Sequence, residues 1–109
     1  MYSQGEVVLI PVPFTDLSAS KRRPVLIISN DSYNNSNPDF IVVAVTSNLI
    51  QQGISLTNGD MIQGSLPKPS VVRCDKIYTL HQGIVVKSIG HIANTVLASV
   101  RIEITNIIS

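Results

Sequence analysis

The stretch FIVVAVTS, residues 40–47, is the most strand-like segment of this 109-residue chain. Apolar and mostly β-branched residues run through it without the polar alternation of a strand that has one face in water. We therefore expect a strand that is buried on both faces near the centre of a sheet. The segment ends in Thr46 and Ser47, residue types that often close a turn or begin a helix.

Shorter segments of the same character lie on both sides of this strand, and turn-forming residues separate them. The expected strands cover residues 6–12, 24–29, 54–56, 70–79 and 84–92. Between them, residues 14–23 are polar and without periodicity, which predicts a surface loop. Residues 30–39 form a long turn region with room for one helical turn. The pattern predicts a β-rich fold, a barrel or twisted sheet.

The C-terminal residues change from a strand-like to a helical period. Apolar side chains recur at helical spacing, and Asn94 stands where an N-cap is expected. Many of these residues are β-branched, which lowers the intrinsic helix propensity, so the helix must be held by packing on the sheet. The apolar set is Val96, Leu97, Val100, Ile104, Ile107 and Ile108.

Length and composition bound the class of protein. Hydrophobic residues make up 44% of the chain and charged residues 14%, which is enough apolar surface for one compact domain over residues 1–109. No apolar run approaches the ~20 residues that span a bilayer, and residues 1–11 lack the pattern of a secretion signal. A single cysteine, Cys74, cannot form an internal disulfide. We expect a cytoplasmic protein.

The net charge of +1 is low for a protein that coats nucleic acid, but the positive charge is clustered. Lys21, Arg22 and Arg23 are adjacent, and Lys68, Arg73 and Lys76 form a second group. Two local clusters in a nearly neutral chain favour the binding of a few phosphates at one site over non-specific binding to a duplex.

The common cofactor and metal motifs are missing from the sequence. It contains no Walker loop, GxGxxG, HExxH or CxxC pattern, and His81, His91 and Cys74 do not make a plausible zinc set. We expect no metal and no cofactor. Cys74 lies in the apolar run VVRCD, where a buried structural thiol is a better interpretation than a nucleophile.

Arg73 and Asp75 share one face of the expected strand over residues 70–79, while Val72 and Cys74 share the other. Their spacing alone favours an ion pair over a catalytic pair. Arg23 and Thr46 are likewise open to an ordinary structural interpretation. Nothing in the spacing requires Arg23, Thr46 and Arg73 to meet, although strand ends and the loops after them are where sites are commonly built.

Four blocks of the sequence together resemble the MazF/PemK toxins of type II toxin–antitoxin systems. They are GEVVLIPVPFTD at residues 5–16, KRRPVLIIS at 21–29, IVVAVTSN at 41–48 and PSVVRCDKIYTL at 69–80. With the expected C-terminal helix, the resemblance covers nearly the whole chain. It implies a mainly antiparallel, SH3-like barrel or twisted sheet of the MazF/CcdB type with a C-terminal helix, assembled as a homodimer.

The resemblance also implies an activity, which is metal-independent cleavage of single-stranded RNA by attack of a ribose 2′-OH on the adjacent phosphate. The products would carry 2′,3′-cyclic phosphate and 5′-OH ends. The residues implied in catalysis are Arg23, Thr46, Arg73 and Asp75. The residues implied in RNA binding are Phe14, Arg22, Ser47 and Lys76.

The general base and the partners follow from the resemblance less directly. Some members of the family carry a His in the first loop, and this chain has none between Glu6 and Arg23. Asp75 could accept the 2′-OH proton or orient Arg73. The implied partners are a cognate antitoxin protein and, only as a complex with it, operator DNA. Two alternatives remain: a CcdB-like topoisomerase inhibitor without catalysis, and a degenerate member that binds only antitoxin and DNA.

Overall fold

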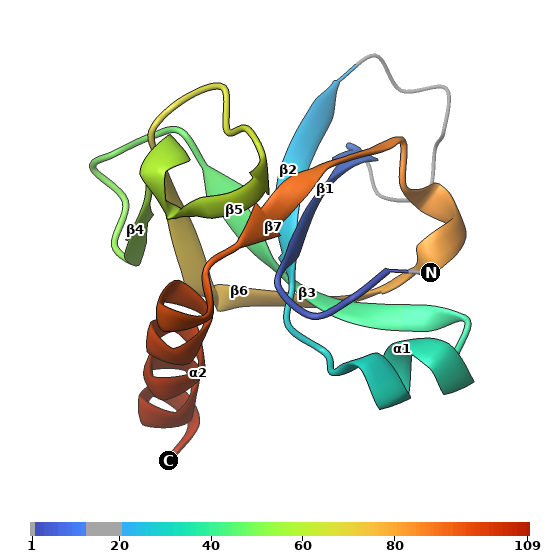
Figure 1. Ribbon diagram of the computed structural model, residues 1–109. Helices are drawn as coiled ribbons and strands as arrows, with labels where there is room; N and C mark the ends of the chain where they lie inside the picture. The colour runs from blue at the N-terminus through green and yellow to red at the C-terminus, as the bar shows by residue number, and fades with distance from the viewer. Residues whose placement is uncertain (1, 13–20) are drawn as a thin grey trace.

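The computed structural model describes residues 2–12 and 21–109 and shows a curled antiparallel sheet with a C-terminal helix (Figure 1). The elements in chain order are β1 (Glu6–Pro11), β2 (Arg22–Ile27), α1 (Asp31–Ser36), β3 (Asp39–Thr46), β4 (Ile54–Leu56), η1 (Asn58–Asp60), β5 (Met61–Gly64), β6 (Ser70–His81), η2 (Gln82–Ile84), β7 (Lys87–Ile92) and α2 (Asn94–Ile108). No helix within this described part of the chain has the length and apolar character needed to cross a membrane.

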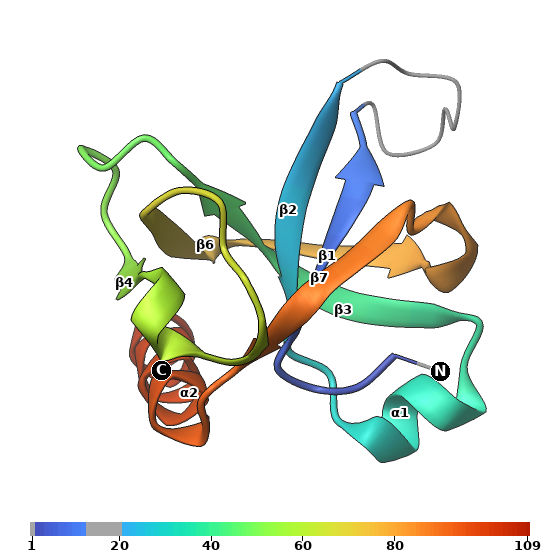
Figure 2. The same cartoon turned by 45° about the horizontal axis from the view of Figure 1, so that its top comes forward.

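The seven strands that the structure describes form one sheet in the order β4-β6-β3-β2-β1-β7-β5. Each pair of neighbouring strands among these seven is antiparallel. The sheet twists so strongly that β3 and β6 cross β1 and β2 at a steep angle, which gives the half-barrel seen in Figure 2. The β-rich, mainly antiparallel fold predicted from the sequence is therefore confirmed.

The central strand β3 is buried on both faces, as its sequence predicted. It pairs with β2 on one side and β6 on the other. Val43 and Val45 belong to the hydrophobic cluster beneath α2, whereas Phe40 and Val42 belong to the cluster on the opposite face. Because successive side chains of a strand point to opposite faces, one strand supplies both clusters.

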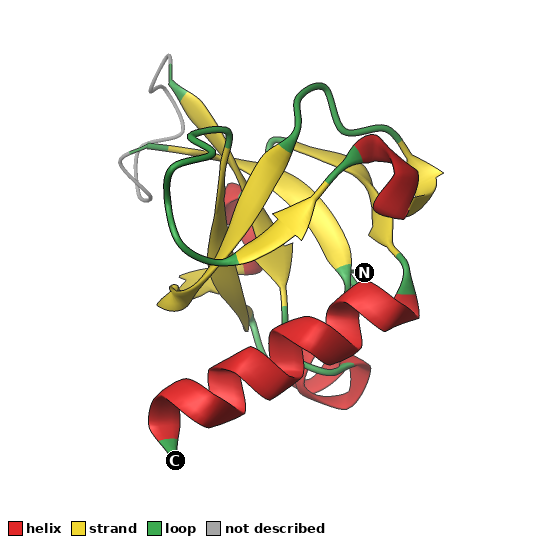
Figure 3. Ribbon diagram, turned by 90° about the vertical axis from the view of Figure 1, so that its left-hand side faces the viewer, coloured by secondary structure: helices red, strands yellow, loops and turns green. Residues whose placement is uncertain are grey.

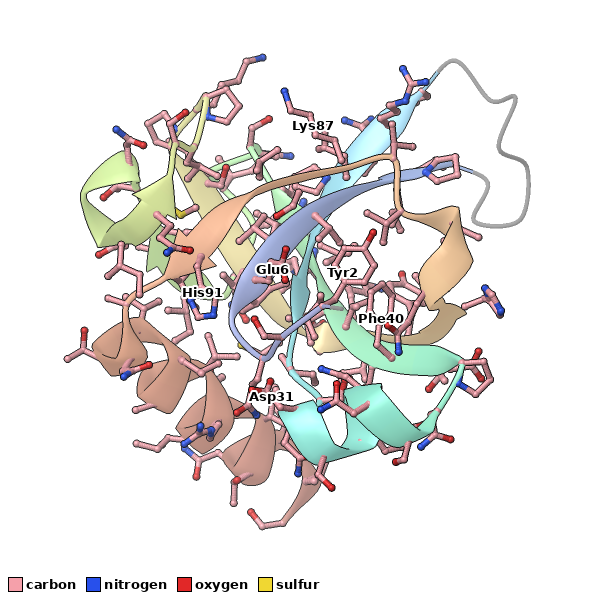
Figure 4. The ribbon with its side chains drawn as sticks, turned by 45° about the vertical axis from the view of Figure 1, so that its right-hand side comes forward. Tyr2, Glu6, Asp31, Phe40, Lys87 and His91 are labelled. Atoms are coloured by element: carbon pink, nitrogen blue, oxygen red, sulfur yellow. The ribbon has the colours of Figure 1, made fainter. Side chains whose placement is uncertain are left out.

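The second hydrophobic cluster includes an aromatic contact that fastens the N-terminus to β3. Phe40 is fully buried, and its ring packs edge-on against Tyr2 with ring centroids 5.9 Å apart (Figure 4). This edge-to-face geometry brings the positive edge of one ring to the negative face of the other. The chain before β1 therefore covers the face of the sheet that α2 does not.

Helix α2 lies across the other face, next to β6 and β4 (Figure 3). Leu97 and Val100 are buried, as the periodicity predicted. Two details differ from the prediction. The N-cap is Ala93 and not Asn94, which is the first helical residue. The apolar residues of the last turn are not buried, because Ile107 and Ile108 are 48% and 73% exposed.

Strand β6 is not the regular strand that its sequence predicted. Arg73 pairs with Ala44, yet Ile77 pairs with the adjacent Val43, so residues 74–76 have no partner on β3. Such a bulge bends a strand and breaks the alternation of its faces. Accordingly Asp75, Lys76 and Ile77 are exposed in succession. Strand β5 was not predicted, and β7 begins at Lys87, later than the sequence suggested.

Candidate active site

Arg23 and Thr46 lie at the same end of two neighbouring strands. β2 and β3 pair antiparallel, with Val25 opposite Ala44 and Leu26 opposite Val43. Arg23 is the second residue of β2 and Thr46 the last residue of β3. Arg23 is exposed and Thr46 half-buried, and both line the same hollow in the surface.

The hydroxyl group of Thr46 organises the turn that follows β3. Its Oγ1 atom accepts a hydrogen bond of 3.1 Å from the backbone N–H of Asn48. A threonine hydroxyl has one donor and two acceptor positions, so this bond leaves the hydroxyl proton available for donation. The turn thereby fixes the oxygen of Thr46 while its proton can be directed at an acceptor in the hollow.

Lys68 enters the same hollow from the connection between β5 and β6. Two hydrogen bonds hold that connection. The side chain of Asn58 accepts from the backbone N–H of Leu66 at 2.8 Å, and the hydroxyl of Ser70 donates to the carbonyl of Lys68 at 2.9 Å. The sequence placed Lys68 in a basic group with Arg73 and Lys76, but in the structure it lines the same hollow as Arg23.

We call this hollow the cationic groove. Its volume is about 700 Å³, room for more than a single phosphate. Its polar lining consists of Arg22, Arg23, Thr46, Ser47, Asn48, Lys68, Ser70 and Tyr78. Among the residues that the structure describes, three cations and no carboxylate line it. A concave site lined by cations concentrates anions and raises the local positive potential.

Arg73 and Asp75 lie elsewhere, in a second hollow of about 420 Å³ that also touches Glu103 and Ile107 of α2. The guanidinium of Arg73 forms a bidentate ion pair with Asp75, in which both N···O distances are 3.0 Å. Hydrogen bonding to Asp75 raises the pKa of Arg73, and the same bond lowers the pKa of Asp75. A third N–H of Arg73 donates to Oε1 of Gln51.

The structure places these residues in two hollows. Arg23 and Thr46 share the cationic groove with Arg22 and Ser47, whereas Arg73 lines the second hollow and bonds to Asp75 and Gln51. These bonds engage three of the five N–H groups of the Arg73 guanidinium. The catalytic role of Arg73 and Asp75 that the resemblance implies stays a prediction.

The remaining residues that the resemblance implied in RNA binding are Lys76 and Phe14. Lys76 is exposed on the bulge of β6 and lines neither hollow. Phe14 lies outside the described residues. Tyr78 packs against the second hydrophobic cluster and also lines the groove, which the sequence did not reveal, because a tyrosine in a β-strand is usually a packing residue.

Cys74 is buried beneath α2, as the sequence predicted. Burial raises the pKa of its thiol to about 11, and the nearby charges of Glu103 and Asp75 act in the same direction. A thiol that keeps its proton at neutral pH is a poor nucleophile. Over residues 2–12 and 21–109, no group of three or more His, Cys, Asp and Glu side chains is placed to hold a metal ion.

Comparison with known proteins resolves the family. Residues 3–108 match the family described as PemK-like, MazF-like toxin of type II toxin–antitoxin system. The chain belongs to this family. The match extends over almost the entire toxin sequence and includes both strands that supply Arg23 and Thr46. No curated protein sequence gives a significant match.

Solved structures show that the toxin also shares the family's fold. An endoribonuclease from Mycobacterial species aligns with a TM-score of 0.73 at 21% identity, covering 96% of this chain and 88% of that one. The Mycobacterium tuberculosis toxin MazF-mt6 aligns at 0.72 and 20%, covering 93% of each chain. A MazE–MazF structure from Deinococcus radiodurans aligns at 0.74 and 21%, covering 99% and 95%.

Proposed function

We propose that this toxin is a metal-independent endoribonuclease that cleaves single-stranded RNA in the cationic groove. The observation that carries the proposal is that Arg22, Arg23 and Lys68 line one hollow together with Thr46, with no carboxylate among the described lining residues. A phosphodiester carries the complementary charge. The endoribonuclease of similar fold from Mycobacterial species supports the same activity.

The proposed reaction uses only groups of the RNA, water and fixed charges of the protein. The 2′-oxygen attacks the adjacent phosphorus and the P–O5′ bond breaks, which leaves a 2′,3′-cyclic phosphate and a 5′-OH. Water takes the 2′-OH proton and supplies a proton to the departing 5′-oxygen. Arg23 stabilises the charge that grows on the phosphoryl oxygens, since a guanidinium fork matches their geometry and stays protonated. The Thr46 hydroxyl donates a hydrogen bond to the same phosphate and keeps its proton.

The other groove residues bind the neighbouring nucleotides in this proposal. Arg22 and Lys68 neutralise flanking phosphates, Ser47 offers a hydroxyl to the RNA, and Tyr78 offers a ring on which an unpaired base can stack. Phe14 remains a proposed stacking residue. Lys76 could reach RNA only beyond the groove. Arg73 and Asp75 act indirectly in this proposal, through the turn after β3.

The proposed partners follow from the family. A cognate antitoxin would block RNA by placing an acidic segment in the cationic groove, and operator DNA would be bound only by the toxin–antitoxin complex. MazE–MazF structures from Deinococcus radiodurans are among those of similar fold. We further propose a cytoplasmic homodimer.

The test is cleavage of a long unstructured RNA by purified protein in EDTA. We expect cleavage by the wild-type protein and a loss of at least about 100-fold in kcat for Arg23→Ala, because one preorganised charge at the reacting group is worth about that much. End analysis of the products should find 2′,3′-cyclic phosphate and 5′-OH termini.

The matched control is Arg101→Ala, which removes an exposed cation on α2 outside the groove and should leave cleavage unchanged. Cleavage that requires a divalent metal would contradict the mechanism. A wild-type protein that leaves RNA intact in both EDTA and magnesium would contradict the enzyme itself and favour a non-catalytic, topoisomerase-binding toxin.

A further inference from the structure

We infer that Gln51 is a positioning residue for the cleavage reaction. It connects the Arg73–Asp75 ion pair to the turn that sets the hydroxyl of Thr46. This inference rests on the proposed endoribonuclease activity and assigns a role to residues that lie outside the cationic groove. The chain of contacts runs through side chains and backbone of residues 46–51 and ends on β6.

The first half of this chain lies within the turn after β3. Thr46 Oγ1 accepts from the backbone N–H of Asn48 at 3.1 Å. The backbone carbonyl of Asn48 accepts from the N–H of Gln51 at 3.2 Å, and its side-chain oxygen accepts from the N–H of Ile50 at 3.3 Å. Asn48 therefore bonds to the Thr46 hydroxyl through its backbone N–H, and to the backbone of Ile50 and Gln51 through its side-chain and backbone oxygens.

The second half anchors the turn to the sheet. The side-chain oxygen of Gln51 accepts from the guanidinium of Arg73. Two further N–H groups of that guanidinium, on Nε and Nη2, make the bidentate pair with Asp75. A fork with two parallel bonds fixes orientation as well as distance. Arg73 also stands on the regular part of β6, where it pairs with Ala44, two residues before Thr46.

Packing does little to fix the same turn. Leu49 and Ile50 are 60% and 88% exposed, so their side chains contribute little burial to hold it. The turn returns to the sheet at Gly53, whose φ of +155° places its backbone so close to β6 that a Cβ would lie 2.1 Å from the carbonyl oxygen of Val72. Between Thr46 and Gly53, the Gln51–Arg73 bond is thus the side-chain tie between the turn and β6.

The position of the Thr46 hydroxyl should affect the rate of RNA cleavage more than the affinity for RNA. The bond to the phosphate must be formed in the transition state, and a small misplacement of a positioned group lowers kcat strongly. Loss of the Gln51 tie should leave the groove cations in place and RNA affinity intact. The signature of positioning is therefore a fall in kcat with an unchanged KM.

The experiment compares three substitutions in single-turnover and steady-state RNA cleavage. Gln51→Met keeps the length of the side chain and removes the acceptor, and should lower kcat about tenfold with KM within twofold. Gln51→Glu keeps an acceptor for Arg73 and should restore most of the wild-type rate. Gln52→Met changes the exposed neighbour and should have no effect. Light scattering and thermal unfolding check that assembly and stability are unchanged.

A double-mutant cycle separates positioning from a general structural effect. In a Thr46→Val background, Gln51→Met should cause no further loss, because the group that it positions is already absent. An undiminished kcat in Gln51→Met, a tenfold loss that persists in the Thr46→Val background, or a failure of Gln51→Glu to restore rate would each overturn the inference. If the wild-type protein does not cleave RNA, the endoribonuclease proposal fails first, and the inference fails with it.

Discussion

The cationic groove predicts how RNA affinity should depend on salt. Arg22, Arg23 and Lys68 come from two segments far apart in the sequence and line one hollow. Each cation that neutralises a phosphate releases condensed counterions, about 0.7 per contact on a single strand. Three contacts then give a slope of about −2.1 for the logarithm of the binding constant against the logarithm of salt concentration.

Removing one of these cations should lower the slope by a predictable amount. For Lys68→Ala we expect about −1.4, so that raising salt from 50 to 200 mM weakens binding about 7-fold, compared with about 18-fold for the wild-type protein. Lys68 is the informative choice, because its place in the groove comes from the structure and not from the spacing of the sequence.

Fluorescence anisotropy of a labelled 2′-fluoro oligonucleotide measures this binding without cleavage, because the sugar lacks the attacking hydroxyl. Arg101→Ala is the matched control, since it changes the net charge equally but lies on α2 outside the groove. Its slope should equal that of the wild-type protein. Equal slopes for Lys68→Ala and the wild-type protein, or an equal decrease for Arg101→Ala, would refute the assignment of phosphate binding to the groove.

Two further predictions concern the core. Burial raises the pKa of Cys74 from 9.0 to about 11, so native protein should lose stability as pH rises from 9 toward 11. At pH 8 the Cys74 thiolate should be about 100-fold scarcer in native than in unfolded protein. Iodoacetamide labelling followed by mass spectrometry, with and without urea, measures this difference. Equal labelling rates for native and urea-unfolded protein would contradict the prediction. Phe40→Ala should lower the free energy of unfolding by about 3–5 kcal/mol, because Phe40 is fully buried; urea titration measures the loss, and one below about 1 kcal/mol would show that the cluster repacks.

The sequence by itself determined the elements whose signal is local. The apolar run over residues 40–47 specifies a strand buried on both faces, and the helical period after Asn94 specifies α2. Each signal comes from neighbouring side chains that share one environment. Strand β5 was not predicted from the sequence, because it is four residues long and exposed over Ile62, Gln63 and Gly64. Its apolar pattern is therefore too weak to indicate a strand.

The tertiary structure alone decided which functional groups meet. Arg73 and Asp75 are close in sequence and do form the ion pair that their spacing favoured, and both line the second hollow and not the groove. Lys68, from the β5–β6 connection, lines the groove. Arg23 of β2 and Thr46 of β3 line it as well. Register, bulges and long-range hydrogen bonds depend on the partner segment, and a single stretch of sequence does not encode where that partner will lie.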